Sequence, residues 1–152
     1  MADQPFVIDY DGFGPVRLGM TKAEVSRVLG EKLVRTHGAG DIECEYLRAN
    51  QHWDGIEFMF SHNRVVRIDV RKGTTETIAG VRLGDGIQKV KNTYGKQLVV
   101  TPHHYIPEPE GSYLTVKSSN GNRAIRFETD NGRVIKYYVG RLPEVEYVEG
   151  CL

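Results

Sequence analysis

Two stretches of the chain alternate between apolar and polar residues, as antiparallel strands do. The first runs over residues 56–60, turns at 61–63 and resumes over 64–70. The second runs over 124–129 and returns over 133–139, after the turn sequence Asp-Asn-Gly at 130–132. Because successive side chains on a strand point to opposite faces, each stretch predicts a hairpin with one apolar face. The Asn-Gly step strengthens the second prediction, since both residues tolerate a positive φ angle.

A short helical pattern precedes each hairpin. Apolar residues recur at helical spacing in both places, as Val25, Val28 and Leu29 and as Ile87, Val90 and Tyr94. Thr21 with Glu24 has the spacing of a capping box, and so does Asp85 with Gln88. A glycine follows each pattern, where helices often end. Helices of about ten residues do not persist alone in water, so we expect them to pack on the hairpins.

These blocks occur twice along the chain. Residues 15–30 align with 80–95, 56–58 with 125–127, and 64–67 with 133–136. Internal duplication of this kind indicates that the fold is built from two copies of one unit. We predict an α+β fold in one domain, residues 1–152, with two tandem helix-plus-antiparallel-hairpin repeats (about 12–72 and 78–148) that form one antiparallel sheet with the helices on one face. Further strands are expected at 46–47, 113–116 and 145–148. The alternative is two separate small domains joined by residues 73–77.

Composition and charge exclude several functional classes. The 152 residues include 20 Lys and Arg and 20 Asp and Glu, so the formal net charge is zero. No bulk electrostatic field then favours a polyanion or an anionic lipid surface. The longest apolar runs, such as 98–100, fall far short of the roughly 20 residues that span a bilayer. We therefore expect neither nucleic-acid binding nor a direct membrane span.

Two cysteines, Cys44 and Cys151, bear on the cellular compartment. Residues 1–5 lack the basic and apolar regions of a secretory signal, which fits a cytoplasmic protein and also an exported one whose signal was replaced. A bond between the cysteines would close a loop of about 100 residues, worth roughly 4.7 kcal/mol in the chain-entropy model. We predict a Cys44–Cys151 disulfide in a periplasmic or secreted protein. Two separate thiols in a reducing cytoplasm are the alternative.

The stretch from Leu18 to Gly30, LGMTKAEVSRVLG, resembles the helix signature of the SmpA/OmlA-type small outer-membrane lipoproteins. Two such units in tandem look like the architecture of the β-lactamase inhibitory protein and of uncharacterised exported bacterial proteins. The second copy departs from the signature, because Asp85 and Gly86 replace Met20 and Thr21. The resemblance implies an envelope or secreted location, a sheet face free to bind a protein, and no catalytic centre. It transfers no target and no binding residue.

A proline-rich connection over residues 101–111 is the most distinctive local feature. It holds three prolines, and two apolar side chains, Tyr105 and Ile106, stand where loops are normally polar. A stiff loop loses little entropy on docking. We therefore propose Tyr105, Ile106 and the adjacent His103 as protein-binding residues. The alternative is a loop that packs these side chains onto its own domain.

Aromatic residues on or beside the predicted strands are the second candidate surface. Trp53, Tyr113 and Tyr138 are expected on the open face of the sheet, where Tyr and Trp commonly anchor protein interfaces. The same face would carry the cations of Arg67, Arg126 and Lys136 and a set of solvated carboxylates, namely Glu57, Asp69, Glu128 and Asp130. Cross-strand aromatic pairs that only stiffen the sheet are the alternative.

Motifs for catalysis are missing from the sequence. It has no Gly-x-Ser-x-Gly elbow and no phosphate-binding loop, and His103 and His104 are adjacent, so on an extended chain they point to opposite sides. We expect a non-enzymatic protein-binding module of the bacterial envelope or secretome, possible roles being an enzyme inhibitor or an assembly factor for a protein partner, and no cofactor or metal site. The alternative is a small-ligand or metal-binding protein that uses the histidine-bearing loops.

Overall fold

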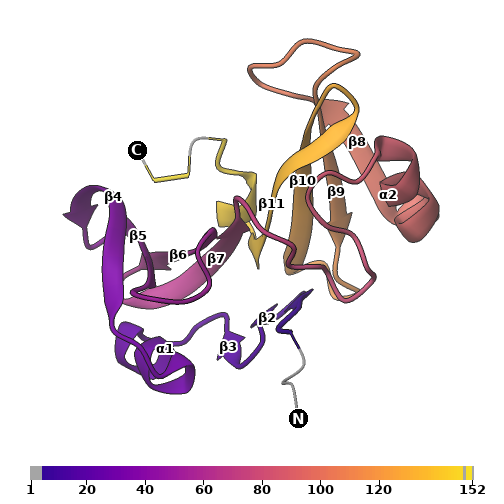
Figure 1. Ribbon diagram of the computed structural model, residues 1–152. Coiled ribbons are helices and arrows are strands. Elements are labelled where there is room, and N and C mark those ends of the chain that lie inside the picture. Colours follow the sequence, from indigo (N-terminus) through magenta and orange to yellow (C-terminus); the bar gives the residue numbers. More distant parts are fainter. Residues whose placement is uncertain (1–4, 149, 152) are drawn as a thin grey trace.

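A large antiparallel sheet dominates the computed structural model, which describes residues 5–148, 150 and 151 and, of these, all side chains except those of 37–40. Its strand order is β4-β5-β6-β7-β11-β10-β9-β8 (Figure 1). The strands of the first half are β4 (Leu33–Asp41), β5 (Cys44–Ala49), β6 (Ile56–Ser61) and β7 (Arg64–Val70). Those of the second half are β8 (Leu98–Pro102), β9 (Ser112–Lys117), β10 (Arg123–Asp130) and β11 (Arg133–Arg141).

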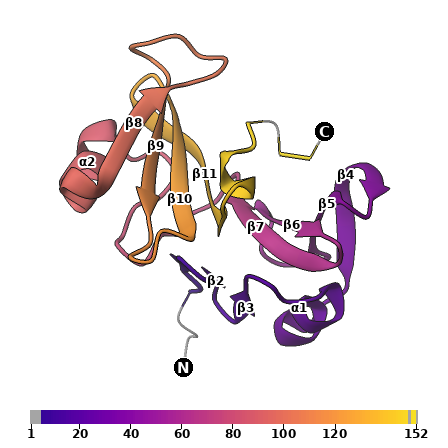
Figure 2. The ribbon, with the colours of Figure 1, turned by 180° about the vertical axis from the view of Figure 1, so that it is seen from behind.

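Smaller elements surround this sheet. The helices are α1 (Lys22–Leu29) and α2 (Ile87–Tyr94), and the 3₁₀ turns are η1 (Gly95–Gln97) and η2 (Glu144–Glu146). A second sheet holds β1 (Ile8–Asp9), β2 (Gly12–Phe13) and β3 (Val16–Arg17). In both views the helices lie at the two ends of the molecule, with β2 and β3 between them (Figures 1 and 2).

The halves of the large sheet join at its centre, where β7 pairs with β11. Asp69 lies opposite Tyr138, and Ile68 lies opposite Val139. One face of this sheet covers the main core, which includes Phe58, Ile68, Phe127 and Tyr137 together with Val25 of α1 and Val90 of α2. Full burial of one such aliphatic or aromatic side chain contributes about 1.5–3 kcal/mol. The helices are therefore held by packing against the sheet.

The predicted α+β fold class is wrong, because strands far outweigh helices. The sequence predicts helix-plus-hairpin repeats with the helices on one face. Instead each helix has only eight residues and is followed by four strands of an eight-stranded sheet, and a second sheet, β1 to β3, packs against the core. The outermost strands explain the difference. Residues 33–41 and 98–102 pair with β5 and β9, although they read as connections.

The local signals at α1 are confirmed. The N–H of Glu24 donates to Oγ1 of Thr21, and the N–H of Thr21 donates to the Glu24 carboxylate, which completes the capping box. Gly30 ends the helix with a left-handed φ of 71°.

At α2 the predicted capping box is wrong. Gly86 is the N-cap, without a side-chain cap. The Asp85 carboxylate instead accepts from the N–H of Arg82 at 2.9 Å and pairs with Lys89 at 3.0 Å. Asp85 therefore stabilises the preceding turn, and the second helix begins one residue later than its sequence predicts.

Both predicted hairpins are present. The turn between β10 and β11 places Asn131 and Gly132 at φ 52° and 74°, as the Asn-Gly step predicts. The strands predicted at 46–47 and 113–116 lie within β5 and β9. The edge strand predicted at 145–148 is wrong, because this segment starts with η2 and packs over the sheet. Within the described residues, no helix has the length and apolar character needed to cross a membrane.

Candidate functional site

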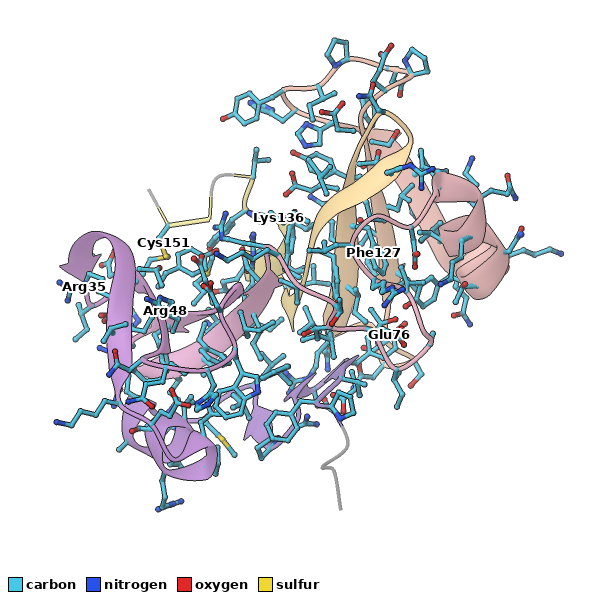
Figure 3. The ribbon with its side chains drawn as sticks, viewed as in Figure 1. Arg35, Arg48, Glu76, Phe127, Lys136 and Cys151 are labelled. Atoms are coloured by element: carbon cyan, nitrogen blue, oxygen red, sulfur yellow. A yellow bond between two sulfur atoms is a disulfide. The ribbon has the colours of Figure 1, made fainter. Side chains whose placement is uncertain are left out.

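The face of the large sheet opposite the main core carries charged and aromatic side chains, and we call it the polar face. Arg67 and Asp69 project from it because they alternate along β7 with the core residues Ile68 and Val70. Strand pairing places further side chains there, namely Tyr46, Glu57, Met59, Tyr113, Arg126, Glu128, Lys136 and Tyr138. Lys136 lies on the side of β11 toward the C-terminal segment (Figure 3).

A buried ion pair occupies the centre of the polar face. The Arg67 guanidinium binds the Asp69 carboxylate with two hydrogen bonds, from Nε to Oδ1 at 2.8 Å and from Nη2 to Oδ2 at 2.9 Å. Both side chains are 0% exposed. The hydroxyl of Tyr46 also donates to Oδ2 of Asp69 at 3.0 Å, and the ring of Tyr138 lies 3.6 Å from the guanidinium carbon. A buried pair is tolerated only when its hydrogen bonds are satisfied in this way.

Charges around Asp69 determine its protonation. Burial alone would raise the pKa of the Asp69 carboxyl, but Arg67, with Lys136 and Arg71 at 3.5 and 3.7 Å, holds that pKa below its usual value. The same burial lowers the pKa of Lys136. The prediction that Asp69 and Glu128 are solvated is wrong, since they are 0% and 8% exposed. The oppositely charged Arg and Asp two residues apart on one strand, flanked by apolar residues, were the available signal.

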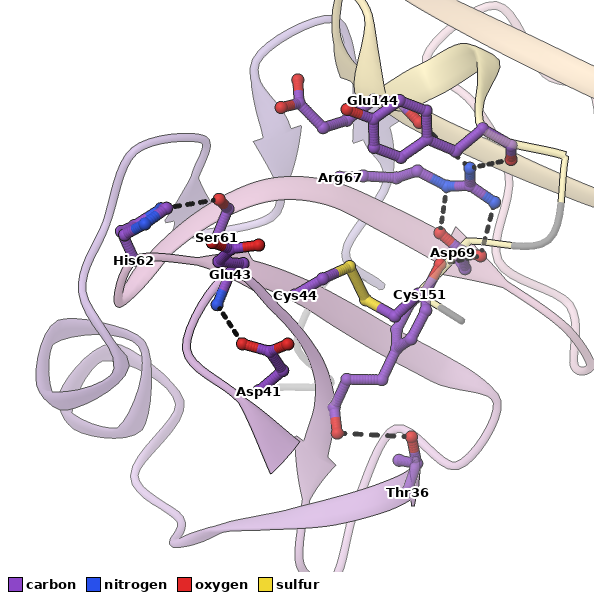
Figure 4. Close-up of a disulfide and its surroundings, with 12 residues drawn as sticks. Thr36, Asp41, Glu43, Cys44, Ser61, His62, Arg67, Asp69, Glu144 and Cys151 are labelled. Carbon is purple, nitrogen blue, oxygen red and sulfur yellow. Dashed lines mark hydrogen bonds and ion pairs between the residues drawn. A yellow bond between two sulfur atoms is a disulfide. The ribbon is translucent and has the colours of Figure 1, made fainter. Parts of the chain in front are cut away.

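The C-terminal segment, residues 143–148, 150 and 151, covers this ion pair. Nη1 of Arg67 donates to the carbonyl oxygens of Glu144 and Tyr147 at 3.1 and 2.8 Å (Figure 4). The predicted disulfide is confirmed, and Cys151 is bonded to Cys44 across 107 residues. The segment is thus attached at both ends, through Arg67 near its start and through the disulfide at its end.

The C-terminal segment determines whether the predicted tyrosines are accessible to a partner. Tyr138 is 0% exposed and packs with Val145 and Ala124, so it cannot reach a partner while the segment is in place. Its hydroxyl and Oε2 of Glu128 are buried without a hydrogen-bond partner among the described residues. Tyr113 is 5% exposed, with the Arg126 guanidinium 4.6 Å from its ring. Neither tyrosine supplies an exposed anchor.

His103 organises the proline-rich loop. Its Nδ1 accepts from the backbone N–H groups of Tyr105 and Ile106 at 3.0 and 3.1 Å, so we assign the proton to Nε2, which donates to Glu128 at 2.8 Å. The ring also stacks on Tyr113, with centroids 4.6 Å apart. His103 therefore acts as a positioning residue for the loop.

Ile106 and Tyr105 point to different environments. Ile106 is half-buried and packs against Gly111. A Cβ atom added at Gly111 would lie only 2.4 Å from the Ile106 side chain. Tyr105 is 59% exposed, with its ring 4.6 Å from that of His104. The loop thus anchors itself through Ile106 and displays Tyr105.

An apolar groove of 470 Å³ runs between this loop and the C-terminal segment, and we call it the tyrosine groove. It is lined by Cys44, His104, Tyr105, Tyr147, Val148, Gly150 and Cys151. The exposed tyrosines at positions 105 and 147 flank it, the second being 42% exposed. The structure therefore brings the proline-rich loop and the disulfide, which are separate features of the sequence, to one site.

Trp53 does not join this site. Its ring stacks on Phe6 at 5.6 Å, and both line a different hollow of 500 Å³ that shares no residue with the tyrosine groove. The described histidine side chains also do not come together as metal ligands. Across the described side chains, no group of three or more His, Cys, Asp or Glu residues could hold a metal ion.

Comparison of the chain with protein-family models, with curated proteins and with solved structures found no match. The function therefore has to be argued from the geometry of the chain itself.

Proposed function

We propose that this chain is a non-enzymatic protein-binding module that works in an oxidising compartment, the periplasm or the secreted space of a bacterium. One observation carries the proposal, namely that two exposed tyrosines flank the apolar tyrosine groove. Tyrosine is enriched among the residues that dominate binding energy, and a groove of this kind accepts an apolar side chain of the partner. An enzyme inhibitor and an assembly factor would both use such a surface.

The surroundings of the groove support this function. Both walls are restrained before a partner arrives, one by the bonds from His103 to the loop backbone and the other by the disulfide at Cys151. A surface held in one conformation loses little entropy on binding, which raises its affinity. The disulfide also supports the proposed location, since such bonds persist mainly outside the reducing cytoplasm.

Site-specific photo-crosslinking tests the proposal. The chain would carry a photoreactive phenylalanine in place of Tyr105 and be expressed in its own host. We expect a discrete crosslinked protein, displaced by excess unmodified chain but not by the Tyr105→Ala variant. The matched control carries the same probe at Ile78, which is 69% exposed and does not line the groove. The same products from both positions, or none from position 105, would contradict the proposal.

A further inference from the structure

A second groove, of 840 Å³, lies on the outer part of the polar face, and we call it the arginine groove. Strands β8, β9 and β10 form its base, the turn between β1 and β2 adds Tyr10 and Asp11, and η2 adds Glu146. We propose that it binds a small hydroxylated carboxylate, such as an acidic sugar, and that Arg126 holds the carboxylate. This site is separate from the tyrosine groove and does not depend on it.

Arg126 is a buried cation, and most of its N–H donors have no acceptor among the described residues. Its side chain is only 10% exposed, and its Nε donates to Oγ1 of Thr115 at 3.0 Å. Its guanidinium lies over the ring of Tyr113, which fixes the orientation of the planar group. For its other N–H donors, the described residues offer no acceptor within hydrogen-bond distance. Since an arginine has five donors and cannot lose its charge, an anion that enters the groove meets a pre-oriented cation whose Nη donors form no hydrogen bond to the described residues.

A carboxylate of the chain already approaches this fork. Oε2 of Glu146 lies 3.6 Å from Nη2 of Arg126, too far for a hydrogen bond, and the Glu146 side chain is 52% exposed. A ligand carboxylate could accept from both Nη1 and Nη2 of Arg126 at about 2.8 Å, the usual distance for a charge-assisted pair. Glu146 therefore occupies part of the ligand's place and competes with it.

The rest of the lining selects a polar ligand. Hydroxyl and amide groups of Thr101, Ser118, Ser119 and Asn120 surround the groove. The Ser118 hydroxyl and the Asn120 amide oxygen bond to each other and to the backbone. An apolar ligand would therefore leave the Thr101 and Ser119 hydroxyls and the Asn120 amide nitrogen without hydrogen bonds, at a cost that a polyhydroxylated ligand avoids. The charges agree with an anion, because Lys117, Arg123 and Arg126 give +3 against −2 from Asp11 and Glu146, an excess of one positive charge.

Titration of the isotope-labelled chain with glucuronate, followed by NMR of backbone amides and arginine Nε–H groups, tests the proposal. Glucose and acetate serve as comparators, since one lacks the charge and the other lacks the hydroxyls. We expect glucuronate to shift the Arg126 Nε–H and the amides of 117–120, and both comparators to bind at least about tenfold more weakly, because each loses a set of hydrogen bonds. Equal binding of either comparator would overturn the proposed ligand class, and no shift with glucuronate would overturn the site.

Two variants assign the roles of the charges. Arg126→Gln should weaken glucuronate binding by about tenfold or more, because a charge-assisted pair is lost. Glu146→Gln, at an exposed position that does not threaten folding, should tighten binding several-fold because it removes the competing carboxylate. Lys91→Gln is the control for loss of one charge, since Lys91 lies on the exposed side of α2. Unchanged affinity in both Arg126→Gln and Glu146→Gln would overturn the assignment.

Discussion

Two arginines of the polar face share a motif but differ in their surroundings. Arg67 lies over the ring of Tyr138 and Arg126 over the ring of Tyr113, each across neighbouring strands. Arg67 has a bidentate carboxylate and two backbone carbonyl oxygens as partners. Arg126 has the hydroxyl of Thr115 and a distant carboxylate. The difference comes from the C-terminal segment, which closes over the first arginine and leaves the second open to a groove.

The comparison separates a structural role from a binding role. A buried arginine such as Arg67, with four of its five donors bonded within the chain, holds the chain together, because moving it would leave charges unpaired. A buried arginine with unused donors can bind a ligand without such a loss. We therefore expect changes at Arg67 to reduce stability and changes at Arg126 to reduce ligand binding.

Replacement of Arg67 should have the largest effect on stability. Arg67→Met leaves the buried Asp69 carboxylate without its main partner, and we expect the free energy of unfolding to fall by about 3–5 kcal/mol. Urea denaturation at neutral pH measures the change. Arg126→Gln is the matched control and should cost about 1 kcal/mol, the net value of one hydrogen bond. Equal losses in the two variants would remove the distinction between the arginines.

Removal of the disulfide should have the second-largest effect on stability. Replacing both cysteines by serine should lower the free energy of unfolding by about 2–4 kcal/mol, the typical effect of a disulfide and less than the roughly 4.7 kcal/mol of the chain-entropy model, since it frees the unfolded chain from a large closed loop. Hydrogen exchange would show where the native state loosens. The amides of Glu146 and Tyr147 donate to the carbonyl oxygens of Pro143 and Glu144. They should stay protected, because Arg67 still binds the carbonyl oxygens of Glu144 and Tyr147, while the amide of Cys151 should exchange faster. Loss of protection at Glu146 and Tyr147 as well would show that the disulfide, and not Arg67, holds the segment.

Acid should weaken the centre of the polar face selectively. The pKa of Asp69 is lowered in the folded chain from an ordinary value of 3.8, so its contribution is present above that value and is lost as the pH falls through the folded pKa. The double variant Arg67→Met with Asp69→Leu lacks this contribution. The difference in unfolding free energy between wild type and double variant should therefore become less favourable to wild type between about pH 5 and about pH 2. A constant difference over this range would contradict the assignment.

Local features could be predicted from the sequence, and pairings between distant segments could not. The α1 caps at Thr21 and Gly30 and the Asn-Gly turn depend on a few neighbouring residues, and all three are present. Strands β4 and β8 lack an alternating pattern and become strands only because β5 and β9 lie beside them. Counting them as connections gave the wrong fold class.

The same rule applies to the functional surfaces. The cysteine pair and the stiff loop around Tyr105 could be identified from the sequence, because the residue types alone mark them. The burial of Tyr138 was not, since it depends on where the last residues of the chain lie. The open donors of Arg126 were hidden for the same reason, because only the path of η2 places Glu146 at 3.6 Å and no closer.

Tyr105 should give the smallest change in stability. Its side chain is 59% exposed, so Tyr105→Ala should alter the free energy of unfolding by no more than about 0.5 kcal/mol, as exposed substitutions usually do. His103→Ala, by contrast, removes the acceptor for two loop N–H groups and the partner of Glu128, and should cost about 1–3 kcal/mol. Urea denaturation of the two variants side by side measures this contrast. A large loss of unfolding free energy in Tyr105→Ala would mean that this side chain packs on its own domain. The tyrosine groove would then have a structural role, as Arg67 has.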